Sequence, residues 1–172
     1  MIKVGVLGAN GKMGTQTVAT ITAAADLELV AALDLGDSIE TLKKSGAEVV
    51  VDFTHPDSVM ANLEFLISNG INAVVGTTGF DDARVAKLQA LTAANPKVGV
   101  LIAPNFAIGA VLMMEFATKA AKYFESAEII ELHHPDKVDA PSGTAARTAE
   151  LMTQARKDAK LSAAPDATNS GI

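Results

Sequence analysis

Residues 4–14 read Val4-Gly5-Val6-Leu7-Gly8-Ala9-Asn10-Gly11-Lys12-Met13-Gly14, a β-branched run that passes into a glycine-spaced turn. Glycines at 8, 11 and 14 permit a tight turn, a close approach of the backbone to a pyrophosphate and close packing of a helix on the strand. The N-terminus of that helix would offer free N–H groups to phosphate oxygens. The segment therefore predicts a strand, a phosphate-binding turn and a helix, with Gly8, Ala9, Asn10, Gly11, Lys12 and Met13 as candidate cofactor-binding residues.

Asp34 ends the second predicted strand, twenty residues after Gly14. A carboxylate at this place accepts hydrogen bonds from the ribose hydroxyls of a dinucleotide. It also repels a 2′-phosphate, so it favours NADH over NADPH, while Lys12 leaves NADPH use open. The spacing is G-x-x-G-x-x-G instead of G-x-G-x-x-G. A purely structural interpretation is that the turn serves backbone geometry alone and that Asp34 caps a loop.

Short β-branched runs alternate with longer segments rich in Ala, Leu and Met. Strands are expected at 2–7, 27–33, 49–53, 73–75, 98–102 and 127–132, and helices at 13–24, 56–69, 81–94, 108–124 and 144–160. The strand runs are almost continuously apolar, as in sheets that are covered on both faces. This alternation predicts an α/β fold with a Rossmann-like, doubly wound parallel sheet.

The composition changes near residue 126, where histidine, proline and charged residues become frequent. We therefore expect a dinucleotide-binding domain over 1–126, and the first part of an α+β substrate-binding domain over 127–172. Residues 127–172 supply one strand, one loop and one helix, which cannot enclose a core. The second domain is thus expected to be incomplete in this chain.

Composition limits the classes of function. With 49% hydrophobic residues among 172, the chain is expected to fold. A net charge of −6 and 4% aromatic residues disfavour nucleic acid as a partner. No apolar run reaches the length of a membrane span, no signal peptide is expected, and the absence of cysteine excludes disulfides. A cytoplasmic protein is expected.

Three further loops follow predicted strands, where open α/β sheets bind their ligands. Phe53-Thr54-His55 follows the third strand, Gly76-Thr77-Thr78-Gly79 the fourth, and Ala103-Pro104-Asn105-Phe106 the fifth. Together they predict the lining of the nicotinamide half of the groove, although each alone is typical of an ordinary turn. His55 precedes a proline and is assigned no role.

A second group of reactive residues lies in Glu131-Leu132-His133-His134-Pro135-Asp136-Lys137-Val138-Asp139-Ala140-Pro141-Ser142-Gly143-Thr144-Ala145. It combines an imidazole that titrates near neutrality, a fixed cation and free N–H groups at a helix start, a set suited to proton donation onto an anionic substrate. A metal site is not expected, because adjacent histidines in extended chain point in opposite directions and no H-E-x-x-H spacing is present. The structural alternative is a surface loop with incidental histidines.

This segment resembles the E-x-H-H-x-x-K-x-D-A-P-S-G-T-A motif of the dihydrodipicolinate reductase family, and the earlier segments resemble the same family in order. They are V-G-V-L-G-A-x-G-K-M-G, D-F-T-H-P-D, A-V-V-G-T-T-G-F and V-L-I-A-P-N-F-A-I-G-A-V-L. The resemblance covers residues 2 to about 147. It implies NADH- or NADPH-dependent reduction of a cyclic unsaturated imine dicarboxylate to tetrahydrodipicolinate, in lysine and diaminopimelate biosynthesis, by a homotetramer.

The resemblance also implies roles for individual residues. His133 would be the proton donor or acceptor, Lys137 a second donor and carboxylate anchor, and His134 a substrate contact. Gly143 and Thr144 would bind a substrate carboxylate, and the dinucleotide would be held by residues 8–13, Asp34, 76–78 and 103–106. Asp136 departs from the family pattern and is expected to face solvent. Family members continue beyond the equivalent of Ile172, so the alternative is a non-catalytic NAD-binding module or an inactive fragment of such a reductase.

Overall fold

The computed structural model describes residues 1–103, 105–133 and 140–162. It contains two compact units, Met1–Ala103 and Pro104–Ile172. The predicted domain bounds, 1–126 and 127–172, divide the chain elsewhere and stay a prediction.

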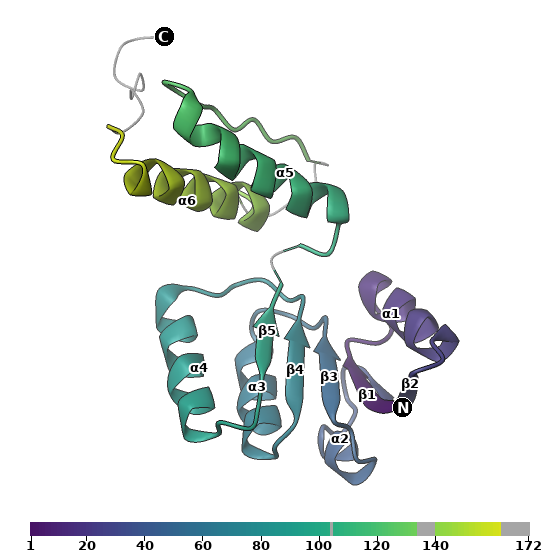
Figure 1. Ribbon diagram of the computed structural model, residues 1–172. Helices are drawn as coiled ribbons and strands as arrows, with labels where there is room; N and C mark the ends of the chain where they lie inside the picture. Colours follow the sequence, from purple (N-terminus) through teal and green to yellow (C-terminus); the bar gives the residue numbers. More distant parts are fainter. Residues whose placement is uncertain (104, 134–139, 163–172) are drawn as a thin grey trace. The chain divides into compact units, whose positions relative to one another are not determined.

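The first unit is built on a parallel five-stranded sheet (Figure 1). Its strands are β1 (Ile2–Leu7), β2 (Leu27–Leu33), β3 (Val49–Asp52), β4 (Asn72–Val75) and β5 (Val100–Ile102), in the order β2-β1-β3-β4-β5. Residues 4–7 of β1 pair with β3 in parallel register, and β1 also pairs with β2. The predicted Rossmann-like parallel sheet is confirmed. Because the chain runs outward from β1 to β2 and then returns to β3, the strand order reverses between β1 and β3.

Helices connect these strands. They are α1 (Lys12–Ala23), α2 (Glu40–Lys44), α3 (Val59–Ser68) and α4 (Asp82–Ala94). The sequence does not predict the short helix α2, and α3 begins three residues later than Pro56 suggests. A turn precedes α3, in which the N–H of Ser58 donates to the carbonyl of His55. Helix α4 is capped as its sequence suggests, because the side chain of Asp81 accepts from the N–H of Arg84.

Both faces of the sheet are buried, which explains the continuous apolar runs of its strands. Val4 and Val6 of β1 belong to one cluster with Ile21 of α1. Leu7 of the same strand belongs to the larger cluster on the other face, together with residues of β3, β4, α2, α3 and α4. The alternation of side chains along β1 therefore joins the two cores to one strand.

The second unit consists of helices among its described residues: α5 (Ile108–Ala120), the 3₁₀ helix η1 (Ala121–Tyr123) and α6 (Gly143–Asp158). The guanidinium of Arg156 in α6 donates to the carbonyls of Ala121, Phe124, Glu125 and Ser162, which fixes the end of α5 against α6.

The strand expected at 127–132 is not formed. These residues have no neighbouring strand within the described part of the second unit, so their backbone lacks a ladder of hydrogen bonds. Within the described chain, no helix has both the length and the apolar character that a membrane span requires.

Candidate active site

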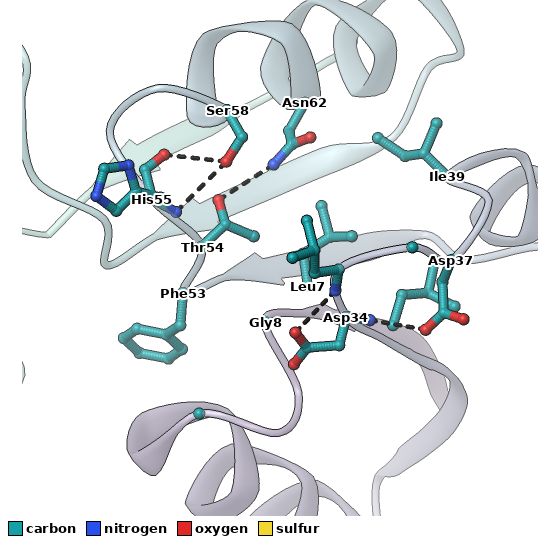
Figure 2. A pocket seen from close by; sticks show the side chains of 14 residues that line it. Leu7, Gly8, Asp34, Asp37, Ile39, Phe53, Thr54, His55, Ser58 and Asn62 are labelled. Carbon is teal, nitrogen blue, oxygen red and sulfur yellow. Dashed lines mark hydrogen bonds between the residues drawn. The ribbon is translucent and has the colours of Figure 1, made fainter.

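A cleft of about 450 Å³ opens where the strand order of the sheet reverses (Figure 2). Its walls come from the ends of β1, β2 and β3 and from the loops that follow them. Open α/β sheets bind their ligands at this kind of position. Residues that line it are Leu7, Gly8, Gly11, Leu33, Asp34, Leu35, Gly36, Asp37, Ile39, Phe53, Thr54, His55, Ser58 and Asn62.

The glycine turn forms one wall of this cleft, and two of its glycines are required by steric contacts. Gly8 has a φ of 76°, and a Cβ there would lie 2.5 Å from the carbonyl oxygen of Phe53. A Cβ on Gly14 would lie 1.9 Å from the carbonyl oxygen of Gly8, so helix α1 can approach the turn only without a side chain at this position. Gly11 meets only an ordinary contact at 3.4 Å. No contact within the turn therefore requires glycine at position 11, and the missing side chain leaves room for a ligand.

Asp34 joins the glycine turn to the end of β2. Its Oδ2 accepts from the N–H of Asn10 at 2.7 Å, and its Oδ1 accepts from the N–H of Leu35 at 2.8 Å. The bond from Leu35, and next the bond from Asn10, hold the pKa of Asp34 below its usual range. The carboxylate is thus ionised and fixed in direction, with lone pairs left for hydroxyl donors.

These features fit a dinucleotide. Helix α1 begins at Lys12 with Gly11 as N-cap, and no side chain caps its first turn. Its first N–H groups can therefore receive a phosphate, and the positive end of the helix dipole favours one. Asp34 lies in the same cleft as Gly8 and Gly11, where it can take ribose hydroxyls. Lys12 and Met13 are exposed at the start of the helix, and Ala9 is buried beneath the turn.

The loop after β4 contributes buried and exposed residues. The hydroxyl of Thr77 donates to Oδ1 of Asp52 at 3.0 Å, and Thr77 is only 6% exposed. The N–H of Gly76 donates to the carbonyl of Asp52, whereas Thr78 is exposed. Thr77 therefore has a structural role, because it attaches the loop after β4 to the end of β3. Gly76 and Thr78 remain the candidates for contact with a ligand.

The candidate residues after β5 fall in different parts of the chain. Ala103 ends the first unit, where its N–H donates to the carbonyl of Val75. Asn105 and Phe106 belong to the second unit, and Pro104 lies outside the described residues. The Oδ1 of Asn105 accepts from the N–H of Ala107 just before α5 begins.

His133 lies beside an acid. Its Nδ1 is 3.8 Å from Oε2 of Glu131, and the His133 side chain is 37% exposed. The Glu131 carboxylate also accepts from the N–H of Ser142 at 3.0 Å, so it is anchored at the start of α6. This arrangement places an accessible imidazole beside a fixed carboxylate, which suits proton transfer.

The start of α6 offers donors to an anion. Ser142 is the N-cap, and its hydroxyl accepts from the N–H of Ala145. Gly143 and Thr144 occupy the first turn, where N–H groups have no partner inside the helix. The hydroxyl oxygen of Thr144 accepts from the amide of Asn105 at 2.9 Å, which leaves its proton to donate. The other predicted substrate residues, His134 and Lys137, lie outside the described residues, as does Asp136.

Sequence reasoning missed several residues of the cleft. Asp37, Ser58 and Asn62 line it without having been singled out, whereas Phe53, Thr54 and His55 belong to a loop that the sequence predicts to line the groove, with no role assigned to His55. The position of Thr54 and His55 after a strand end is the signal that predicts them, whereas Asn62 reaches the cleft from α3 and has no such signal. Glu131 was also missed as a partner of His133, although it begins the same motif. Among the described residues, no group of three or more His, Asp or Glu is placed to hold a metal ion.

Comparison with known proteins agrees with this geometry. Residues 2–106 match the family model "Dihydrodipicolinate reductase, N-terminus", and residues 109–170 match "Dihydrodipicolinate reductase, C-terminus". A 4-hydroxy-tetrahydrodipicolinate reductase from Nocardia farcinica is 62% identical over 171 residues, which cover 99% of this chain and 69% of the relative. A 4-hydroxy-tetrahydrodipicolinate reductase from Corynebacterium efficiens is 60% identical over 171 residues, which again cover 99% of this chain and 69% of the relative.

A solved structure shows the same likeness. It is a dipicolinate-bound dihydrodipicolinate reductase from Paenisporosarcina sp. TG-14, with a TM-score of 0.75 and 39% identity. The match covers 91% of this chain and 67% of that one. The similarity therefore extends over both compact units.

Proposed function

Because the chain belongs to the dihydrodipicolinate reductase family, we propose that it binds NADH or NADPH in the cleft beside Asp34 and serves reduction of 4-hydroxy-tetrahydrodipicolinate to tetrahydrodipicolinate. The observation that carries this proposal is that the sterically required glycine turn and the ionised Asp34 line one cleft at the reversal of strand order. Matches to both family models do not favour the alternative, a non-catalytic NAD-binding module.

The cofactor would be held by the turn and the neighbouring strand ends. The N–H groups at the start of α1 take the pyrophosphate, and Asp34 takes the ribose of the adenosine half. Gly76, Thr78 and Ala103 receive the nicotinamide half, to which the family pattern adds residues 104–106. When bound, the reduced nicotinamide supplies a hydride.

The substrate is a dicarboxylate, and the start of α6 suits one of its carboxylates. The N–H groups of Gly143 and Thr144 and the free proton of the Thr144 hydroxyl are three donors on one helical turn. Lys137 adds a cation and His134 a further contact, as the family motif implies. Donors at fixed positions hold the ring for attack at one carbon.

His133 supplies the proton. 4-Hydroxy-tetrahydrodipicolinate loses its hydroxyl group and a neighbouring ring proton as water, which leaves a conjugated imine. Reduction of this imine places a hydride on one ring carbon and needs a proton on its neighbour. The exposed imidazole of His133 can donate it, and the carboxylate of Glu131, 3.8 Å from Nδ1, can stabilise the protonated ring. Glu131 is itself fixed by Ser142, which links the proton donor to the carboxylate-binding turn.

NADH is the preferred coenzyme in this proposal. The ribose side of the cleft is lined by Asp34 and Asp37, and no lysine or arginine of the described chain lines the cleft. Asp37 stays close because its Oδ2 accepts from the N–H of Asp34 at 2.8 Å. Two carboxylates oppose the charge of a 2′-phosphate, whereas they can accept from a free 2′-hydroxyl.

The remaining expectations concern the setting of the enzyme. We propose that it works in the cytoplasm as a homotetramer, in diaminopimelate and lysine biosynthesis. Its partner is a small dicarboxylate and not nucleic acid, because the net charge of −6 opposes binding to phosphate backbones.

The test is a pair of measurements on the same preparation. Calorimetry gives the NADH dissociation constant, and absorbance of the reduced nicotinamide follows its oxidation after 4-hydroxy-tetrahydrodipicolinate is added. Saturable NADH binding with dicarboxylate-dependent oxidation supports the proposal. NADH binding without oxidation would support the alternative, a non-catalytic NAD-binding module. Absence of NADH binding would reject the cleft as the cofactor site.

A further inference from the structure

A buried carboxylate lies beneath the cleft without taking part in the proposed chemistry. Asp52 ends β3 and is 0% exposed. Its Oδ1 accepts from the N–H of Thr54 at 2.9 Å, from the hydroxyl of Thr54 at 2.6 Å and from the hydroxyl of Thr77 at 3.0 Å. Its Oδ2 accepts from the amide of Asn62 at 2.9 Å. A buried carboxyl group is tolerated only when its oxygens take part in hydrogen bonds, and here uncharged donors supply them.

These donors belong to separate segments of the chain. Thr54 lies in the loop between β3 and α3, Thr77 in the loop between β4 and α4, and Asn62 in α3. Thr54 and Asn62 also line the cleft, and their side chains are joined at 3.2 Å (Figure 2). One carboxylate therefore connects the two loops that follow β3 and β4 to each other and to a helix.

A second connection joins the same two loops. The guanidinium of Arg84 donates to the carbonyl of Pro56 at 2.9 Å and to the carbonyl of Gly79 at 2.8 Å. The loops touch closely there, because a Cβ on Gly79 would lie 2.7 Å from the Cβ of Pro56. Asp52 and Arg84 thus fix the loop 53–58 to the loop 76–81 at two separate points.

We propose that Asp52 and Arg84 are positioning residues that lock these two loops into one rigid edge for the nicotinamide half of the cofactor. This inference rests on the proposed function, in which Gly76 and Thr78 receive that half. A loop that is already ordered loses less conformational freedom when its ligand binds. Loss of either connection would therefore weaken binding of the nicotinamide half, while the glycine turn and Asp34 would still hold the adenosine half.

The test compares two ligands that differ in the nicotinamide. NADH contains both halves, whereas ADP-ribose contains only the adenosine, pyrophosphate and second ribose. For Asp52→Asn we expect the NADH dissociation constant to rise about tenfold or more, because an amide facing the Asn62 amide leaves a donor unmet. The ADP-ribose constant should change less than about threefold, because this ligand lacks the nicotinamide ring and its adenosine and pyrophosphate are held at the turn and Asp34.

The exchange Asp52→Asn/Asn62→Asp gives the rescue. It keeps the hydrogen bond between positions 52 and 62 with donor and acceptor reversed, and the amide introduced at position 52 retains an oxygen for Thr54 and Thr77. We expect NADH affinity to return to within about threefold of the wild type. Arg84→Met tests the second connection without burying a new polar group, and it should also weaken NADH selectively. If Asp52→Asn fails to fold, the NADH and ADP-ribose dissociation constants of Arg84→Met alone test the proposal.

The control is Asn72→Ala. The Asn72 side chain accepts from the N–H of Gly99 and donates to the carbonyl of Glu48, at the start of β4 and so at the opposite end of the sheet. The Asn72→Ala substitution should lower the melting temperature and leave the dissociation constants of NADH and ADP-ribose unchanged. Equal weakening of NADH and ADP-ribose in the Asp52 and Arg84 variants, or unchanged NADH binding, overturns the inference. Absence of NADH binding by the wild type would instead reject the proposed function.

Discussion

The N–H of Asn10 donates to Oδ2 of Asp34 at 2.7 Å, which ties the glycine turn to the end of β2. This single bond joins the two parts of the proposed adenosine site, although 24 positions separate the residues. The pyrophosphate-binding turn and the ribose acceptor therefore share one rigid reference before any ligand arrives, which reduces the cost of ordering them on binding.

Asp34 should set the coenzyme preference. Replacing Asp34 with Asn removes a charge that opposes a 2′-phosphate and weakens the acceptor for a 2′-hydroxyl, so the NADPH-to-NADH affinity ratio should rise about tenfold. Calorimetric titration with both coenzymes measures this ratio. Asp26→Asn is the matched control, because Asp26 carries the same charge just before β2, at the other end of that strand. An unchanged ratio in Asp34→Asn would remove Asp34 from the ribose site.

The same carboxylate predicts a pH dependence. Hydrogen bonds from Leu35 and Asn10 lower the pKa of Asp34, so its bound form needs no ionisation step in the neutral range. NADH affinity should be independent of Asp34 ionisation from about pH 8 to pH 5 and should fall only below about pH 4. The contribution of Asp34 to stability is likewise present above its unfolded pKa and is lost as pH falls through the lower folded pKa. A carboxyl titration followed by NMR that placed this pKa above the usual aspartate range would contradict both expectations.

Gly14 should be required for folding of the turn and not only for cofactor binding. Gly14→Ala puts a Cβ against the Gly8 carbonyl and should lower the free energy of unfolding by about 2 kcal/mol or more. Gly11→Ala is the control for stability, because its Cβ meets nothing closer than 3.4 Å, and its cost should stay below about 1 kcal/mol. Urea unfolding measures both. Equal costs would show that the turn relaxes around a Cβ at position 14.

His133 and Lys137 should affect different kinetic constants. His133→Gln should lower kcat by roughly 10²–10⁴-fold, because proton donation is lost in the transition state. Lys137→Ala should mainly raise KM for the dicarboxylate, because an anchoring charge is lost. Lys119→Met is the control, since this lysine pairs with Glu115 on the exposed surface of α5. Steady-state kinetics that match the wild type for both variants would exclude the proposed roles.

Arg156 should stabilise the second unit. Arg156→Met removes bonds to carbonyls at the end of α5 and beyond, and should lower the unfolding free energy by about 2–4 kcal/mol. Arg147→Met on the same helix removes only an exposed pair with Glu150 and should cost less than about 1 kcal/mol. Thermal unfolding followed by circular dichroism compares them. Similar shifts for the two variants would mean that the Arg156 bonds are replaced by water without loss.

The sheet was predictable because local signals and burial agree along its strands. β-branched runs, glycine after β1 and an acid after β2 each mark a boundary by local chemistry. Helix α2 was missed because five residues are too few to show a helical period. The strand expected at 127–132 has a suitable apolar run, yet a strand also needs a partner, and sequence pattern does not reveal one.

The residues of the candidate site also fall into those that the sequence predicts and those that it does not. The glycine turn and Asp34 could be found by spacing, because their chemistry depends on neighbours along the chain. The Asp52 connection could not, since Asp52 and Thr77 are 25 positions apart and meet only after β3 pairs with β4. Likewise, Arg84 reaches Pro56 across 28 positions. Such contacts depend on strand register and carry no local pattern.

The proposed reaction requires that the reduced nicotinamide held in this cleft give its hydride to a cyclic dicarboxylate. The most direct measurement uses NADH deuterated at the transferring C4 position with 4-hydroxy-tetrahydrodipicolinate, followed by mass spectrometry and NMR of the product. We predict tetrahydrodipicolinate that carries one deuterium on a ring carbon, formed in step with NADH oxidation. Product without deuterium, or NADH oxidation without reduction of the dicarboxylate, would contradict the proposed hydride transfer.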